Sequence, residues 1–179
     1  SPLAAAAALL VPGYACPSTP AAGDAVATGG GTQNTNVYIY PPNGGAYETT
    51  NSSDYIDWQL YSSGTYTIVV EDVGNDDAGA YTLSMVDLTA GPYTSAGDSD
   101  GGAITSSSVK GGTTSGVGDL DVYTFSGTAG EHVLMSIMET AGAGYNAYVA
   151  LYRPNGLVYA TYSSQRLDAQ LDATGTWSA

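Results

Sequence analysis

Lysine and arginine are scarce in this sequence. Only three residues are Lys or Arg, against 17 Asp and Glu, so the formal net charge is −14. Proteins that bind nucleic acids or anionic membranes need cationic side chains to neutralise phosphates. The charge balance therefore argues against both kinds of partner. It favours divalent cations as ligands, and calcium above all, because calcium prefers carboxylate and carbonyl oxygens.

Cysteine and histidine occur once each, as Cys16 and His132. One cysteine cannot form an intrachain disulfide, and two such residues cannot make a zinc site. Catalysis by a serine or cysteine nucleophile needs a histidine base, and we expect His132 to face solvent on a strand. Paired carboxylates could still hydrolyse glycosides, but the Asp residues cluster in turn sequences, where Asp is common. We expect a protein that is not an enzyme.

The sequence also lacks a long apolar run. Residues 3–11 are apolar but too short to span a bilayer, so we expect no membrane span. Small residues at positions 13 and 15 resemble a secretory cleavage site before Cys16. The segment is therefore either the remnant of a signal peptide or a retained apolar strand. As a strand it could pair with another subunit through Leu3, Leu9, Leu10 and Val11.

Tyrosine, threonine, serine and glycine are abundant instead, with 15 Tyr and 24 Gly, which favours strands and tight turns. Residues 64–85 show this best. Tyr66, Ile68 and Val70 alternate with polar residues, a run of turn formers follows, and Tyr81 and Leu83 alternate again. Two alternating runs around a turn predict a β-hairpin.

A repeat of about 110 residues runs through the chain. Residues 37–44 match residues 149–156 at an offset of 112, and residues 56–60 match residues 167–171 at an offset of 111. This period is too long for a solenoid and suits a whole small domain. The fold class that we predict is all-β, with two related copies of one β unit.

The ordered motifs at residues 118–125, 129–131, 151–156 and 174–177, followed by a tail like residues 64–83, resemble the bacterial pre-peptidase C-terminal (PPC) domain. The resemblance covers about two thirds of the chain. It implies jelly-roll-type β-sandwich units in secreted or cell-surface proteins. It further implies that such units are not catalytic, that some bind calcium, and that some engage insoluble protein or polysaccharide.

Neither copy matches the whole PPC pattern. We expect an apolar segment and linker in residues 1–31 and a Gly/Ser/Thr-rich linker in residues 91–117. The first unit, residues 32–90, contains only the back half of the PPC pattern. The second unit, residues 118–179, lacks the closing hairpin of that pattern. The sequence could be a fragment, the halves could complement each other, or strands from neighbouring chains could complete each sandwich.

Three groups of side chains are candidates for ligands. Calcium could bind at turn carboxylates and amides, namely Asp72, Asn75, Asp76, Asp77, Asp119 and Asp121, with Asp98 and Asp100 as further candidates. Asn51 begins a glycosylation sequon. Tyr residues could stack on glycans or on another subunit, although packing across strands explains them as well.

These observations predict an extracellular or cell-surface structural protein that assembles with copies of itself through β-strand complementation. Strands such as residues 67–70 lack the Lys residues that usually protect sheet edges. The alternative is a PPC-like accessory or binding module of a secreted hydrolase.

Overall fold

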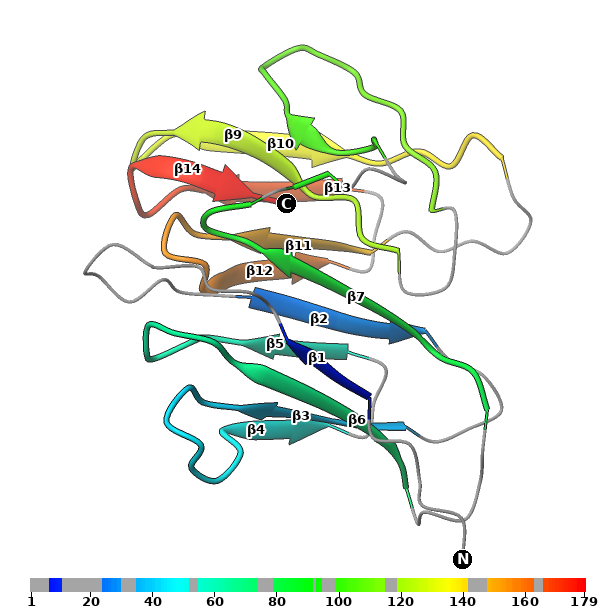
Figure 1. The fold of residues 1–179 in the computed structure, drawn as a ribbon. Helices are drawn as coiled ribbons and strands as arrows, with labels where there is room; N and C mark the ends of the chain where they lie inside the picture. The colour runs from blue at the N-terminus through cyan, green and yellow to red at the C-terminus, as the bar shows by residue number, and fades with distance from the viewer. Residues whose placement is uncertain are drawn as a thin grey trace, which may run out of the picture. The chain divides into compact units, whose positions relative to one another are not determined.

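The computed structural model of residues 1–179 describes residues 7–10, 24–29, 35–51, 55–73, 79–91, 93–94, 99–114, 119–141, 148–162 and 166–179. Its strands are β1 (Ala7–Leu10), β2 (Asp24–Gly29), β3 (Thr35–Tyr40), β4 (Thr49–Asn51), β5 (Tyr55–Trp58), β6 (Thr67–Asp72), β7 (Thr82–Asp87), β8 (Gly102–Ala103), β9 (Tyr123–Gly127), β10 (His132–Ser136), β11 (Val149–Tyr152), β12 (Val158–Tyr162), β13 (Arg166–Gln170) and β14 (Gly175–Ser178) (Figure 1). The described residues contain no helix, and so none that could cross a bilayer. The protein is all-β, as predicted.

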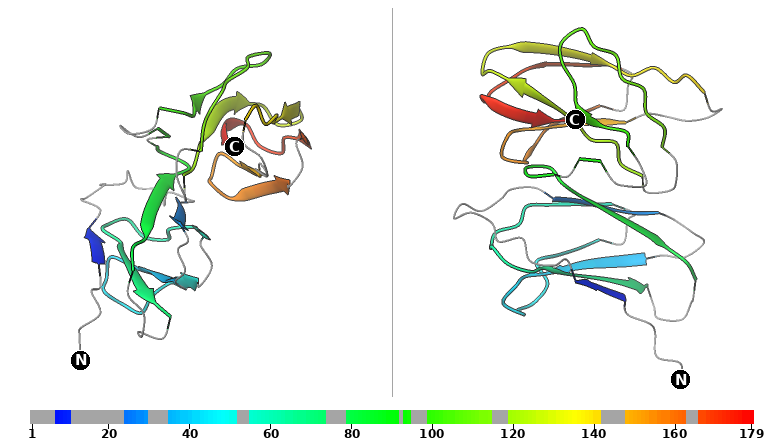
Figure 2. Two further views of the ribbon diagram at one scale, coloured as in Figure 1. Left: turned by 90° about the vertical axis from the view of Figure 1, so that its right-hand side faces the viewer. Right: turned by 45° about the horizontal axis from the view of Figure 1, so that its top comes forward.

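The chain forms two compact units. The first contains residues 1–92 and 113–120, and the second contains residues 93–112 and 121–179. Figure 2 shows the strands of each unit from two further directions. The boundary differs from the predicted linker, because residues 93–112 belong to the second unit and the rest of residues 91–117 belong to the first.

The first unit is a β-sandwich. Its four-stranded sheet has the order β1-β6-β3-β4, and its three-stranded sheet has the order β5-β2-β7. Side chains from both sheets form one core, which contains Val37, Ile39, Ile56, Tyr66, Ile68 and Val70 with Leu83 packed against it. Tyr66, Ile68 and Val70 are buried on the same face, as their alternation predicted.

The predicted hairpin of β6 and β7 is wrong. β6 pairs with β1 and β3, whereas β7 pairs with β2 in the other sheet. Alternation identifies both strands and their apolar faces, but it does not identify their partners. Here Leu83 reaches the core from the sheet opposite Ile68.

The second unit repeats this arrangement. Its five-stranded sheet has the order β12-β11-β14-β9-β8, and its two-stranded sheet pairs β10 with β13. The core of this unit contains Val149, Leu151, Leu167, Ala169, Leu171 and Trp177. The order β4-β3-β6-β1 in the first unit therefore corresponds to β12-β11-β14-β9 in the second.

The first unit is more than a back half, which corrects the prediction. β1 and β2 come from residues 1–31 and occupy the places that β9 and β10 hold in the second unit. Through their partners, Leu10 corresponds to Thr124 and Val26 to Met135, at offsets of 114 and 109. Unequal connections between the strands hide this correspondence from a search at the fixed offset of 112.

Candidate functional site

The two units differ at one sheet edge. In the first unit, β2 lies between β5 and β7 and pairs with both. The corresponding strand β10 pairs with β13, from His132↔Gln170 to Ser136↔Arg166. Among the described strands, β10 pairs with no other.

Side-chain exposure follows this difference. On β13, the core-facing residues Leu167 and Ala169 are only 1% and 8% exposed. Val133, Met135 and Ile137, on and just after β10, face the same core but are only half-buried. The edge of β10 is therefore an apolar border that is incompletely shielded from water.

Two large apolar residues along this edge are mainly exposed. Leu134 lies on the outer face of β10 with 61% of its surface exposed, and Met138 follows the strand with 78% exposed. His132 begins the strand and is exposed, as predicted. We define the β10 edge as residues 132–138.

The edge of β9 is covered, in contrast. β8 pairs with β9 in parallel, and the amides of Gly102 and Ile104 donate to the carbonyl oxygens of Val122 and Thr124, both at 2.8 Å. This approach requires glycine at position 101, since a Cβ there would lie 2.6 Å from the carbonyl oxygen of Val122.

The N-terminal segment has a partner within the chain. β1 pairs with β6 in the register Ala7↔Val70 to Leu10↔Thr67. Leu9 and Leu10 thus lie on the edge strand of the four-stranded sheet, whereas Leu3 and Val11 fall outside the described residues.

The predicted calcium ligands are dispersed. Asp72 is half-buried at the end of β6, and Asp119 is half-buried before β9, while Asn75, Asp76 and Asp77 lie outside the described residues. No cluster of three or more His, Cys, Asp or Glu suited to a metal occurs in the described part of the chain.

Asp100 and Asp121 both lie near Gly112, although 20 residues separate them. A Cβ on Gly112 would lie 2.9 Å from Oδ2 of Asp121, 2.7 Å from the Tyr123 hydroxyl and 3.6 Å from Cβ of Asp100. The sequence contains no signal for this proximity, because residues 100, 112 and 121 are not neighbours along the chain.

Three tyrosines form an aromatic group beside β3 in the first unit. The ring of Tyr47 lies 5.2 Å from that of Tyr38 and 6.0 Å from that of Tyr40, both edge to face. The Tyr38 hydroxyl donates to Oε1 of Glu71 at 2.6 Å. This hydrogen bond, with burial and the Glu71 charge, raises the pKa of Tyr38. The rings pack mainly on one another, although Tyr47 remains 49% exposed.

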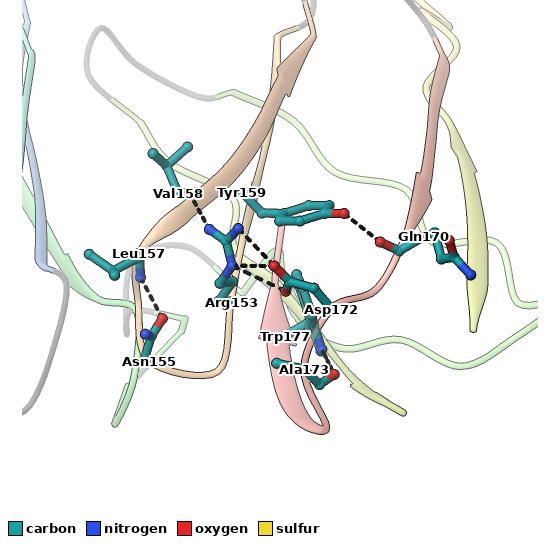
Figure 3. Close-up of polar contacts among 9 residues, drawn as sticks. All are labelled: Arg153, Asn155, Leu157, Val158, Tyr159, Gln170, Asp172, Ala173 and Trp177. Carbon is teal, nitrogen blue, oxygen red and sulfur yellow. Dashed lines mark hydrogen bonds and ion pairs between the residues drawn. The ribbon is translucent and has the colours of Figure 1, made fainter. Parts of the chain in front are cut away.

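A polar cluster braces the turns of the second unit (Figure 3). Arg153 makes a two-pronged contact with Asp172, with Nε and Nη2 at 2.9 to 3.1 Å from the carboxylate, and its Nη1 donates to the carbonyl oxygen of Val158. The guanidinium lies 4.5 Å from the centre of the Tyr159 ring, which packs edge to face on Trp177. The cluster joins the turn after β11 to the turn before β14.

The glycosylation candidate Asn51 ends β4, at the other edge of the four-stranded sheet, with Val37 as its register partner. Ser52 and Ser53 of the sequon lie outside the described residues.

No protein-family model matches the chain, and neither any curated protein nor any solved structure does. The resemblance to the PPC domain and the jelly-roll topology stay predictions, while the all-β sandwich character rests on the strands and cores described above.

Proposed function

We propose that this protein is an extracellular, non-catalytic structural subunit that assembles with copies of itself into a filament or surface array. In this polymer, each subunit is linked to its neighbours by a β-strand that adds to a sheet of the neighbouring subunit. The observation that supports this proposal is the β10 edge, which pairs only with β13 among the described strands.

An edge of this kind favours strand addition. It presents backbone donors and acceptors to an incoming strand, and the half-buried Val133, Met135 and Ile137 gain further burial when a strand covers them. Edge strands of monomeric proteins are commonly protected by Lys or Pro. The sequence of β10, His-Val-Leu-Met-Ser, contains neither.

The N-terminal segment is the donor that we propose for a second contact. In a single chain β1 already covers β6, so donation requires exchange, in which β1 of one subunit covers β6 of the next in the same register. The first 23 residues carry no charged side chain, which lets this segment approach an acidic neighbour without repulsion. Deletion of residues 1–15 should abolish assembly, and normal polymers after the deletion would contradict the role of this segment.

Negative-stain electron microscopy of the native protein, with and without a calcium chelator, tests the proposal. We expect regular polymers. Their loss in chelator would assign a structural role to calcium, with Asp100 and Asp121 as the first ligands to replace. Dispersed globular particles under both conditions would contradict assembly as the function.

The alternative function is an accessory or binding module of a secreted hydrolase. The aromatic group of Tyr38, Tyr40 and Tyr47 supports it, because exposed tyrosine can stack on sugars. This function predicts saturable binding to insoluble polysaccharide or protein, with affinity reduced by Tyr47→Ala. A glycan at Asn51 belongs to either function and would appear as a mass increment on the peptide that contains it.

A further inference from the structure

We propose that Asn43 is a site of spontaneous deamidation and that its counterpart Asn155 is protected from the same reaction. The two residues belong to the only Asn-Gly sequences of the chain, and a proline precedes both, in residues 42–44 and 154–156. This inference goes beyond the proposed function and does not depend on assembly.

An Asn-Gly sequence deamidates when its backbone attacks its own side chain. The amide nitrogen of Gly44 attacks Cγ of Asn43. A bond between nitrogen and Cγ forms, and the bond from Cγ to Nδ2 breaks as ammonia leaves with the former amide proton. Water then opens the cyclic imide at one of its two carbonyls, which gives aspartate or isoaspartate. Glycine favours the attack because it has no Cβ to hinder the nitrogen. The attack also requires that the glycine amide first leave its own hydrogen bond.

The structure gives both asparagines the same kind of turn. The amide of Gly44 donates to the carbonyl oxygen of Pro41 at 3.1 Å, and the amide of Gly156 donates to that of Arg153 at 2.8 Å. The two glycines have similar φ angles, 70° and 78°. In each turn the Asn side-chain oxygen accepts a hydrogen bond from the amide two residues further on. The two sites are therefore matched in sequence and backbone, and they differ in what restrains the turn.

The turn of the second unit is closed at its base. The amide of Arg153 donates to the carbonyl oxygen of Leu157 at 2.9 Å, and its Nη1 donates to that of Val158 at 2.8 Å. The pair with Asp172 anchors the guanidinium across the turn (Figure 3). Gly156 is buried. Release of the attacking amide in this turn therefore has to break these contacts as well.

The turn of the first unit has proline at position 41, where the second unit has Arg153. Proline has no amide hydrogen that could close the turn and no cationic side chain that could brace it. Gly44 is exposed, together with the other residues from 42 to 47. An exposed turn with fewer hydrogen bonds opens at a lower free-energy cost. The amide of Gly44 is therefore free to attack more often than its counterpart.

Deamidation changes the first unit in two ways. Both products add a carboxylate to a unit that contains no Lys or Arg, and isoaspartate also lengthens the backbone of the turn by a methylene group. The turn connects Tyr40 to Tyr47 along the chain, so both changes fall beside the aromatic group of the first unit.

Peptide mapping by mass spectrometry of the full chain follows both sites in one sample. The protein is incubated at mildly alkaline pH, which promotes deprotonation of the attacking amide, and the aspartate and isoaspartate forms of each peptide are quantified over time. We expect Asn43 to be converted about tenfold faster than Asn155, because the additional contacts of the second turn are equivalent to one net hydrogen bond or more. The matched control is the same chain unfolded in urea, in which the two sites should react at nearly equal rates.

Two variants test the cause of the protection. Arg153→Pro gives the second turn the sequence of the first, Pro-Pro-Asn-Gly, and should raise the rate at Asn155 to near that at Asn43. Arg153→Ala keeps the backbone donor and loses only the guanidinium, so it should give an intermediate rate. The fluorescence of buried Trp177 verifies that the second unit of each variant is folded.

Equal rates in the folded wild-type chain, or faster conversion of Asn155, overturn the inference. A folded chain in which neither site reacts, although both react in urea, overturns it as well, since the first turn would then be protected too. A folded variant at Arg153 that keeps the wild-type rate at Asn155 shows that the protection does not come from this residue, which also contradicts the inference. Each of these outcomes leaves the proposed function untouched, because none of them involves assembly.

Discussion

Met135 and Leu167 are register partners on β10 and β13, and they provide a direct test of how far β10 is shielded from water. Both face the core of the second unit, but Leu167 is 1% exposed while Met135 is half-buried. Replacing a fully buried Leu by Ala costs about 3 kcal/mol, because burial is lost and a cavity remains. Met135→Ala removes a side chain that is already in contact with water and leaves no closed cavity. We expect a cost of about 1 kcal/mol.

Each unit has a single tryptophan, Trp58 in the first and Trp177 in the second, which makes the assay specific. In a Trp58→Phe background, urea unfolding followed by fluorescence reports the second unit alone. With an m value of about 1 kcal/mol/M, Leu167→Ala should lower the unfolding midpoint by about 3 M and Met135→Ala by about 1 M. The measurement is made at a protein concentration at which the chain is monomeric.

Equal losses for the two variants would refute the reasoning, because they would show that β10 is covered on both sides in the isolated chain. The control is Leu134→Ala on the outer face, which should change the stability by less than about 0.5 kcal/mol.

Three further predictions concern single contacts. Gly127→Ala inserts a Cβ among the packed side chains of the second core and should destabilise this unit by about 1 to 3 kcal/mol in the same urea assay, with a neutral result contradicting the packing. Arg153→Ala breaks the ion pair with Asp172, in which the two side chains are 29% (Arg153) and 47% (Asp172) exposed. The free energy of unfolding should therefore fall by about 1 kcal/mol or less. A larger decrease would show that the cluster is better shielded from water than its exposure indicates. The pKa of Tyr38 is raised by its hydrogen bond to Glu71, so the stability from this contact is complete below about pH 10 and is lost as the pH rises through the raised pKa. Tyr38→Phe should remove that part of the alkaline loss, measured as the pH dependence of the unfolding midpoint reported by Trp58, and an unchanged pH profile would show that Tyr38 contributes nothing to it.

Alternation of apolar residues predicted strands β6 and β7 from the sequence, because the side chains of a half-buried strand alternate between core and solvent. Tyr66, Ile68 and Val70 show this well. The partner of each strand was not predictable in the same way. β6 and β7 follow one another closely, yet their apolar faces approach one core from opposite sheets, so proximity along the chain suggested the wrong pairing.

The opening strands of the first unit were missed for a different reason. Pairing positions fix how β1 and β2 correspond to β9 and β10, but the connection from β1 to β2 is five residues longer than that from β9 to β10. Loops tolerate such changes at small cost. The β10 edge could not be predicted either. It is recognised only by comparing strand orders, because β2 pairs with both β5 and β7, whereas β10 pairs with β13.

The distribution of charge gives a direction to any association of these chains. The first unit holds ten Asp and Glu residues and no Lys or Arg, while the second holds seven acidic residues and all three cations, Lys110, Arg153 and Arg166. Two first units brought together meet the strongest repulsion that the molecule can produce, and a first unit meets less beside a second unit. Salt shortens the range of this repulsion, with a Debye length of about 10 Å at 0.1 M and about 3 Å at 1 M. A polymer of these chains should therefore have a head and a tail, and it should grow faster as the ionic strength of its surroundings rises.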